Sequence, residues 1–269
     1  MYTIDKPFAY GVSVSGDNFT DRKTETRNLV MNFTHGVNTI LISPRRMGKT
    51  SLVHRAIEQI NDDNIIPVFL DVYDCRDEYD FYNKFSEEII RASSSTVDAA
   101  LRNVAEFIGR ISPKISVSPD LVNEYSISLG LTPKQIRPEE ILALPEMLAK
   151  KRDKHLLICI DEFQQIGEFA DSLTVQKKMR GVWQLQKNVS YCLFGSKKHM
   201  LENIFQNKRM PFYQFGQMMY LGKIDQKDWV EYITSRFEAC GKKIPPEISE
   251  KLCQLVECYS SYVQQLAWN

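Results

Sequence analysis

The stretch "SPRRMGKTS", residues 43–51, has the residue types needed to hold a phosphate group. A helix N-terminus offers unpaired N–H groups and the positive end of the helix dipole to an anion. Gly48 would let the backbone approach the phosphates, Lys49 would contact the β- and γ-phosphates, and the hydroxyl of Thr50 would coordinate Mg²⁺. This spacing predicts a nucleotide-binding loop built from Ser43, Pro44, Arg45, Arg46, Met47, Gly48, Lys49, Thr50 and Ser51.

Ser43 is the one departure from the phosphate-loop pattern G-x-x-x-x-G-K-[ST]. Serine disfavours a positive φ, but the following Pro44 favours an extended conformation for the residue before it. We therefore expect Ser43 to leave the strand in an extended conformation. Taken alone, Gly-Lys-Thr could equally belong to a capped surface loop.

Two carboxylates in "HLLICIDEFQQI" support the nucleotide hypothesis. Asp161 and Glu162 end an apolar strand, and ligands of open parallel sheets bind at the carboxyl ends of strands. We expect Asp161 to hold Mg²⁺ through water, so that Thr50 and Asp161 are the metal residues. Glu162 would orient and deprotonate the attacking water. Two acids that merely end a strand are the simpler alternative, and the two motifs together argue against it.

Five apolar runs predict the strands that position these residues. They are residues 38–43, 65–72, 155–160, 190–195 and 218–222, and amphipathic helical segments separate several of them. Near-continuous apolar strands alternating with helices are typical of a mainly parallel sheet covered on both faces. The predicted fold class is therefore α/β, with a five-stranded P-loop sheet.

The order of these signals predicts two domains. Residues 1–224 would form the α/β domain, with a β-hairpin at about 114–131 inside a long insertion. Residues 225–269 carry only helix signals and would form a small helical lid. The last helical pattern has no cap after it, so we expect the natural protein to continue.

Composition limits the classes of partner. The 34 basic and 34 acidic residues balance, which gives no global field for nucleic acid or anionic membranes. The six cysteines lack metal-ligand spacing, the four histidines are scattered, and no run is long enough to span a membrane. We therefore expect a cytoplasmic protein without zinc and without strong nucleic-acid binding.

With these residues in place, the chain resembles the archaeal-type ATPase family within the AAA+/STAND P-loop NTPases. The resemblance rests on "NFTDRKTETRNL", on "SPRRMGKTSL" as Walker A, on "LLICIDEFQQI" as Walker B, on "CLFGSKKHML" and on "YVQQLA". It implies that the backbone near Phe19 to Arg22 lies by the adenine. It also implies a strand order in which an extra strand separates the Walker A strand's partners.

The same resemblance implies further catalytic residues. Ser196 best matches the sensor-1 position, and Arg209 is the best candidate for an arginine finger, although Arg45 or Arg46 could serve instead and a solvated turn is the simpler interpretation of Arg209. Two features depart from the family. An expected Gly-x-Pro reads Cys258-Tyr259-Ser260, and no sensor-2 arginine is found.

The leading hypothesis is an Mg²⁺-dependent ATP hydrolase that acts as a regulatory or signal-transducing switch, with low turnover in the absence of a partner. One alternative is a nucleotide-binding interaction module with little hydrolysis, and a less favoured one is a P-loop small-molecule kinase. The cofactors would be ATP and Mg²⁺. A protein partner could bind through the inserted hairpin or the lid, and self-association stays open.

Overall fold

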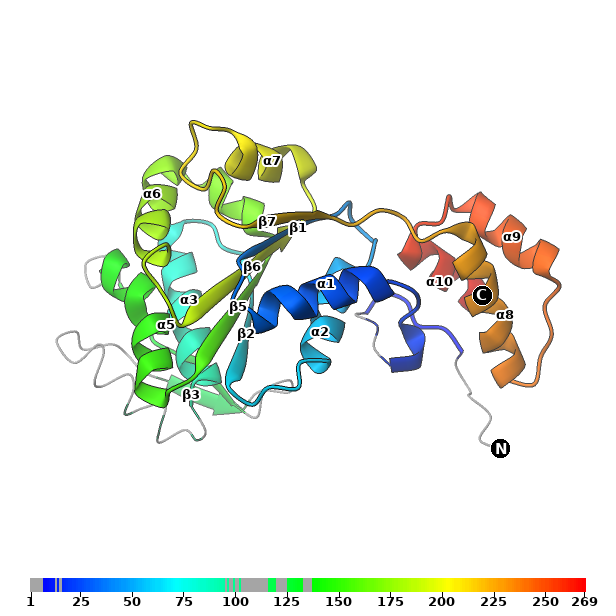
Figure 1. The fold of residues 1–269 in the computed structure, drawn as a ribbon, viewed down its shortest axis with the longest axis horizontal. Coiled ribbons are helices and arrows are strands. Elements are labelled where there is room, and N and C mark those ends of the chain that lie inside the picture. The colour runs from blue at the N-terminus through cyan, green and yellow to red at the C-terminus, as the bar shows by residue number, and fades with distance from the viewer. Residues whose placement is uncertain are drawn as a thin grey trace. The chain divides into compact units, whose positions relative to one another are not determined.

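The computed structural model describes residues 7–12, 14, 16–94, 96, 99, 102, 116–119, 125–132 and 137–269. Strands of the main sheet are separated by helices up to β7, and three consecutive helices follow it (Figure 1). The α-helices are α1 (Lys23–Thr34), α2 (Lys49–Glu58), α3 (Glu78–Ala92), α5 (Pro138–Arg152), α6 (Ser172–Trp183), α7 (Lys198–Gln206), α8 (Gln226–Ala239), α9 (Pro246–Leu255) and α10 (Ser260–Trp268), with 3-10 segments η1 (Gly16–Asn18) and η2 (Phe163–Glu168). Within the described ranges, no helix has both the length and the apolarity required to cross a membrane.

Five strands form one all-parallel sheet in the order β2-β5-β6-β1-β7. They are β1 (Thr39–Ile42), β2 (Ile65–Asp71), β5 (His155–Asp161), β6 (Val189–Gly195) and β7 (Gln217–Tyr220). Each overlaps one of the five predicted apolar runs and differs from it by at most two residues at either end. The predicted α/β fold class is confirmed.

The register of the sheet aligns the carboxyl ends of neighbouring strands. β2 pairs with β5 from Ile65↔His155 to Asp71↔Asp161, and β5 pairs with β6 up to Ile160↔Leu193. Every residue of β6 and the five central residues of β5 are buried. Because strands buried on both faces must be apolar at nearly every position, these two sequences show no polar alternation.

β2 lies at one edge of the sheet and contains a proline, Pro67. The N–H of Val72 donates to the carbonyl of Asp161 at 3.2 Å. Successive N–H groups of a strand point in opposite directions, so the nitrogen of Pro67 faces away from β5. The proline therefore removes no hydrogen bond from the sheet.

The chain divides into two compact units. One of them, here called the sheet unit, comprises residues 32–40 and 61–218. In it α3 packs against β2 and α5, and α5 packs against α6 (Figure 1). Its core is rich in aromatic rings: Trp183 stacks on Tyr191 with a centroid distance of 4.2 Å, and Phe163 lies 5.6 Å from Phe205 and 5.5 Å from Phe212.

The other unit, here called the loop-lid unit, comprises residues 1–31, 41–60 and 219–269. Helices α8, α9 and α10 share a core with Phe8, built around the buried side chains of Trp229, Ile233 and Val263. Arg236 of α8 is buried as well, and its guanidinium donates to the carbonyl of Pro7 at 2.6 Å and to Oδ1 of Asn18 at 3.0 Å.

A separate two-stranded antiparallel sheet consists of β3 (Ser116–Pro119) and β4 (Tyr125–Ser128). Both strands fall within the predicted hairpin at 114–131, of which residues 114, 115 and 120–124 lie outside the described residues. The chain after β4 is attached to α3: the N–H of Leu129 donates to Glu87 at 2.8 Å, and that of Leu131 donates to Asn83 at 3.0 Å.

Candidate nucleotide site

The phosphate loop of the loop-lid unit leads from β1 into α2. Gly48 is the N-cap residue of α2 and has φ 82° and ψ 24°, in the left-handed region. Its carbonyl accepts the N–H of Leu52 at 2.9 Å, which closes the first helical turn. A Cβ on Gly48 would meet nothing within 4 Å, so its need for glycine is conformational. Lys49 and Thr50 therefore form the first turn of the helix, at the positive end of its dipole.

Two residues of the loop are fixed by burial. Ser43 is fully buried, and Met47 is only 3% exposed. Ser43 does not adopt a positive φ, as expected for a residue before proline, and its hydroxyl donates to the carbonyl of Pro44 at 3.1 Å. Ser51, next in the helix after Thr50, accepts the N–H of Val14 at 3.0 Å. The N-terminal segment is thus attached to the loop's helix.

The loop also contacts the first turn of α10. Arg46 has a left-handed backbone, with φ 68°, and its carbonyl accepts the N–H of Ser261 at 3.1 Å. Its guanidinium lies 4.7 Å from the ring centre of Tyr262, in a cation–π contact. Sequence reasoning missed this contact, because a tyrosine in a helical pattern has many other uses. It provides a physical connection between the loop and the lid.

In the sheet unit, Glu162 directly follows β5 and has a left-handed backbone, with φ 53°. Its N–H donates to the side chain of Asp161 at 2.7 Å. The Ser196 hydroxyl, directly after β6, donates to Oε2 of Glu162 at 3.0 Å, and Nε2 of Gln164 donates to the same oxygen. The structure therefore brings together three of the predicted residues, Asp161, Glu162 and Ser196.

A third acid, Asp71, was not predicted as a site residue. It is the last residue of β2 and pairs in register with Asp161. Partial burial raises the pKa of Asp71, and the Asp161 carboxylate acts in the same direction, whereas the N–H of Tyr73 opposes both. Its place next to the last residue of the apolar run 65–72 was the only sequence signal.

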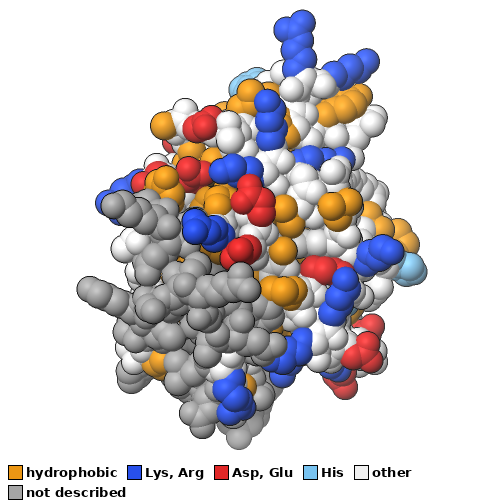
Figure 2. All heavy atoms as spheres, turned by 90° about the vertical axis from the view of Figure 1, so that its left-hand side faces the viewer, with side chains coloured by type: hydrophobic (Ala, Val, Ile, Leu, Met, Phe, Trp, Pro, Cys, Tyr) orange, Lys and Arg blue, Asp and Glu red, His pale blue; other side chains and the backbone are white. Residues whose placement is uncertain are grey.

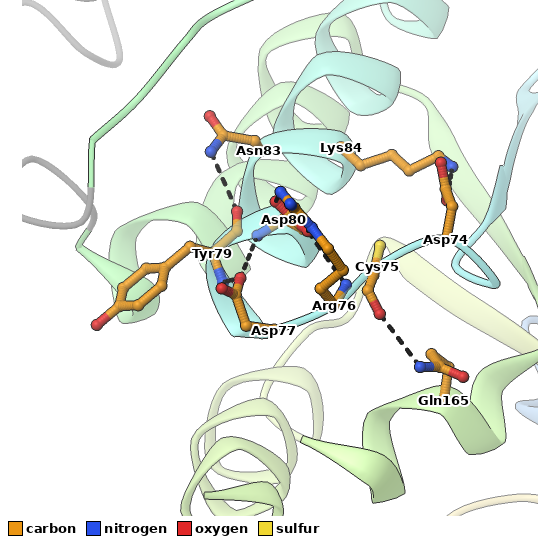
Figure 3. A network of polar contacts seen from close by, with 9 residues as sticks. All are labelled: Asp74, Cys75, Arg76, Asp77, Tyr79, Asp80, Asn83, Lys84 and Gln165. Carbon is orange, nitrogen blue, oxygen red and sulfur yellow. Dashed lines mark hydrogen bonds and ion pairs between the residues drawn. The ribbon is translucent and has the colours of Figure 1, made fainter. Parts of the chain in front are cut away.

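The loop after β2 is held by a network of polar contacts (Figure 3). Asp77 caps α3, since its carboxylate accepts the N–H groups of Tyr79 and Asp80 at 2.9 Å each. Arg76 pairs with Asp80 at 2.8 Å. Nε2 of Gln165 donates to the carbonyl of Cys75 at 3.2 Å, which connects this loop to the segment after Glu162.

Arg209 lies in an exposed turn after α7, where its N–H donates to the side chain of Asn207 at 3.0 Å. Of the predicted loop residues, Pro44 and Arg45 are exposed, while Lys49 and Thr50 are partly buried. In the described part of the chain, no group of three or more His, Cys, Asp or Glu side chains could hold a metal ion. Thr50 and Asp161 offer oxygen donors, the type that Mg²⁺ prefers, and so fit that ion in kind.

Comparison with solved structures identifies the fold. The Walker-type ATPase PABY2304 of Pyrococcus abyssi has a TM-score of 0.69 at 17% identity, over 96% of this chain and 69% of that one. The Aeropyrum pernix ORC2 protein, in ADPNP-ADP complexes, has a TM-score of 0.56 at 13% identity, over 98% of this chain and 64% of that one. Cdc6p from Pyrobaculum aerophilum has a TM-score of 0.55 at 12% identity, over 97% and 62%. The chain has the fold of an archaeal-type AAA+ ATPase domain, as the sequence predicted.

No protein-family model matches the sequence, and no curated protein matches it. At identities of 12–17% the solved structures establish the fold and carry no residue roles.

Proposed function

We propose that this chain is an Mg²⁺-dependent ATPase that acts as a regulatory switch. The observation that carries the proposal is the left-handed Gly48 at the start of α2, followed at once by Lys49, Thr50 and Ser51. A loop of this shape presents successive N–H groups and the helix dipole to an anion. The ATPases among the structures of similar fold support the same function.

Each group of candidate residues has a distinct task. The loop of residues 43–51 would bind the phosphates, with Lys49 as the positive charge on the β- and γ-phosphates. Thr50 and Asp161 would hold Mg²⁺, which when bound neutralises phosphate charge. Glu162 would take a proton from water as the water oxygen bonds to the γ-phosphorus and the bond to ADP breaks. Ser196 would contact the γ-phosphate, and Arg209 would serve as an arginine finger.

The contact between Arg46 and α10 supports the switch. A bound γ-phosphate would alter the loop, and the carbonyl and guanidinium of Arg46 would pass that change to Ser261 and Tyr262. This route from loop to lid needs no sensor-2 arginine. The helical lid, residues 225–269, or the inserted hairpin would then present a surface to a protein partner.

One observation favours a second candidate, a nucleotide-binding module with little hydrolysis. The lid has a single arginine, Arg236, and its guanidinium is occupied by Pro7 and Asn18. An arginine used in this way supplies no charge to a transferring phosphate. In that case nucleotide binding alone would set the conformation that a partner recognises.

We expect no strong nucleic-acid binding by this chain. The formal net charge is zero. On the face seen in Figure 2, Lys and Arg side chains are scattered among acidic and apolar ones. Since phosphate contacts supply most non-specific affinity, a balanced surface of this kind predicts weak binding at physiological salt. A cytoplasmic location and self-association of the chain belong to the same proposal.

Phosphate release from the purified chain tests both candidates. We expect release to require Mg²⁺, and Glu162→Gln to keep ATP affinity while release falls by roughly 10² or more, the range for losing a general base. Glu168→Gln is a matched control, because Glu168 is an exposed acid of the same segment that pairs with Lys197. ATP binding without release in the unmodified chain would favour the module. Release from Glu162→Gln at the unmodified rate would remove Glu162 as the base.

A further inference from the structure

Gln164 is a buried amide whose side chain contacts the candidate base Glu162. It lies in η2, two residues after Glu162, and only 2% of it is exposed. Its Nε2 donates to Oε2 of Glu162, but its Oε1 has no hydrogen-bond partner among the described residues. A buried carbonyl without a partner destabilises a fold, and an apolar side chain of similar shape would avoid that cost.

The end of β6 has a shape that admits this amide. Gly195 is the last residue of β6, and a Cβ built on it would lie 1.9 Å from Oε1 and 3.1 Å from the side-chain carbonyl carbon of Gln164. Any other residue at 195 would therefore displace the amide. The next residue, Ser196, donates to the same oxygen of Glu162. Two donors from different segments of the chain thus meet at one carboxylate oxygen.

The segment that carries Gln164 is held on both sides. Before it, the ring of Phe163 packs against those of Phe205 and Phe212 in the aromatic core. After it, Gln165 donates to the carbonyl of Cys75 in the loop that follows β2 (Figure 3). With both neighbours anchored, the fold sets where the amide of Gln164 points.

We propose that Gln164 is a positioning residue for hydrolysis, which orients the carboxylate of Glu162 through its Oε2. Holding one carboxylate oxygen with two donors fixes the plane of the group, and with it the direction from which the carboxylate can accept a proton from water. Gln164 does not itself contact the reacting atoms. The inference rests on the role of Glu162 in the proposed function.

Gln164→Met tests the inference, since methionine is close in shape but cannot donate. We expect kcat for ATP hydrolysis to fall roughly tenfold or more with KM unchanged, because orientation is lost and binding is not. We expect the melting temperature to stay the same or rise, because the unpaired carbonyl is removed. Gly195→Ala should lower kcat in the same way by displacing the amide.

Gln176→Met is the matched control. Gln176 of α6 is fully buried, donates to the hydroxyl of Ser172 at 2.8 Å, and also has an Oε1 without a partner among the described residues. The same chemical change there should leave kcat unaltered. A loss of kcat equal to that of Gln164→Met would show a general effect on the fold and overturn the proposal.

A double variant separates this inference from the proposed function. In Glu162→Gln there is no carboxylate to orient, so adding Gln164→Met should cause no further loss of hydrolysis. A further loss of the same size as in the unmodified chain would overturn the positioning role. The positioning role would also be overturned if Gln164→Met kept the wild-type kcat while Glu162→Gln had a low kcat. That result would leave the proposed function unchanged. Wild-type kcat in Glu162→Gln would overturn both.

Discussion

Replacing Gly48 by alanine tests two properties of the phosphate loop separately, its backbone conformation and its affinity for ATP. Gly48 has φ 82° and ψ 24°, and a Cβ there would meet nothing within 4 Å. The cost in the protein is therefore conformational, about 1–2 kcal/mol for an L-residue in the left-handed region. For a chain of this size that lowers the melting temperature by about 2–8 °C. Differential scanning calorimetry would measure it.

The same loop predicts a separate effect on ATP. If backbone N–H groups of the loop surround the phosphates, the methyl group added by Gly48→Ala would occupy space that a phosphate needs. ATP affinity should then fall by roughly tenfold or more, about 1.4 kcal/mol. Titration with a fluorescent ATP analogue, with and without Mg²⁺, measures this loss.

Gly241→Ala is the control for the loss of stability caused by the left-handed backbone. Gly241 has φ 71°, and a Cβ there would also meet nothing within 4 Å, so its loss of stability should match that of Gly48→Ala. It follows α8, its N–H donates to the carbonyl of Glu238 at 2.8 Å, and the substitution should leave ATP affinity unchanged. Wild-type ATP affinity in Gly48→Ala would refute the phosphate loop. Wild-type stability in that variant would refute the left-handed backbone.

Three further predictions concern Ser196, Ser43 and His155. Ser196→Ala should slow hydrolysis at saturating ATP by roughly tenfold or more, as measured by phosphate release, and an unchanged rate would reduce Ser196 to a structural role. Ser43→Gly should leave ATP affinity within a few-fold of that of the unmodified chain in the titration with the fluorescent ATP analogue. Ser43 does not adopt a positive φ, so it has no backbone strain that glycine would relieve. A hundredfold gain in affinity would contradict this. His155 is partly buried, and its Nε2 lies 2.8 Å from the Ser190 hydroxyl. Burial lowers the pKa of His155, so the unfolded state binds the proton more readily than the folded state. The stability of the fold should therefore fall as the pH drops below about 6.5. Chemical denaturation between about pH 5 and 7 should show that the stability of His155→Gln depends less on pH than that of the unmodified chain. An equal pH dependence would exclude His155 as a cause.

The strands and the loop were predictable because their signals are local. Near-continuous apolar runs mark β5 and β6, and the Gly48-Lys49-Thr50 spacing marks the start of α2. Hydrophobic pattern and glycine chemistry act over a few residues, so one sequence suffices to detect them. Ser43 illustrates the limit of such patterns, since it departs from the usual motif and still has an allowed backbone.

The polar contacts around Glu162 were not predictable in the same way. Gln164 meets Gly195 only because β5 and β6 are neighbours in a particular register, and Asp71 meets Asp161 for the same reason on the other side of β5. Register is a property of the whole sheet, fixed by packing between elements far apart in sequence. The left-handed backbone of Glu162 is likewise imposed by its surroundings, because glutamate has no preference for it.

Pro67 bears on how copies of this chain could associate. An open strand edge presents unpaired N–H and C=O groups to any other strand, and such edges are common starting points for sheet extension and aggregation. At the middle of β2 the proline offers no donor on the side that faces away from β5, and its ring lies there instead. Continuous pairing of a second copy along β2 would therefore lose a hydrogen bond at its centre. Self-association, if it occurs, is expected to use helix surfaces in preference to this edge, and Pro67→Val should make the chain more prone to form β-rich aggregates on mild heating.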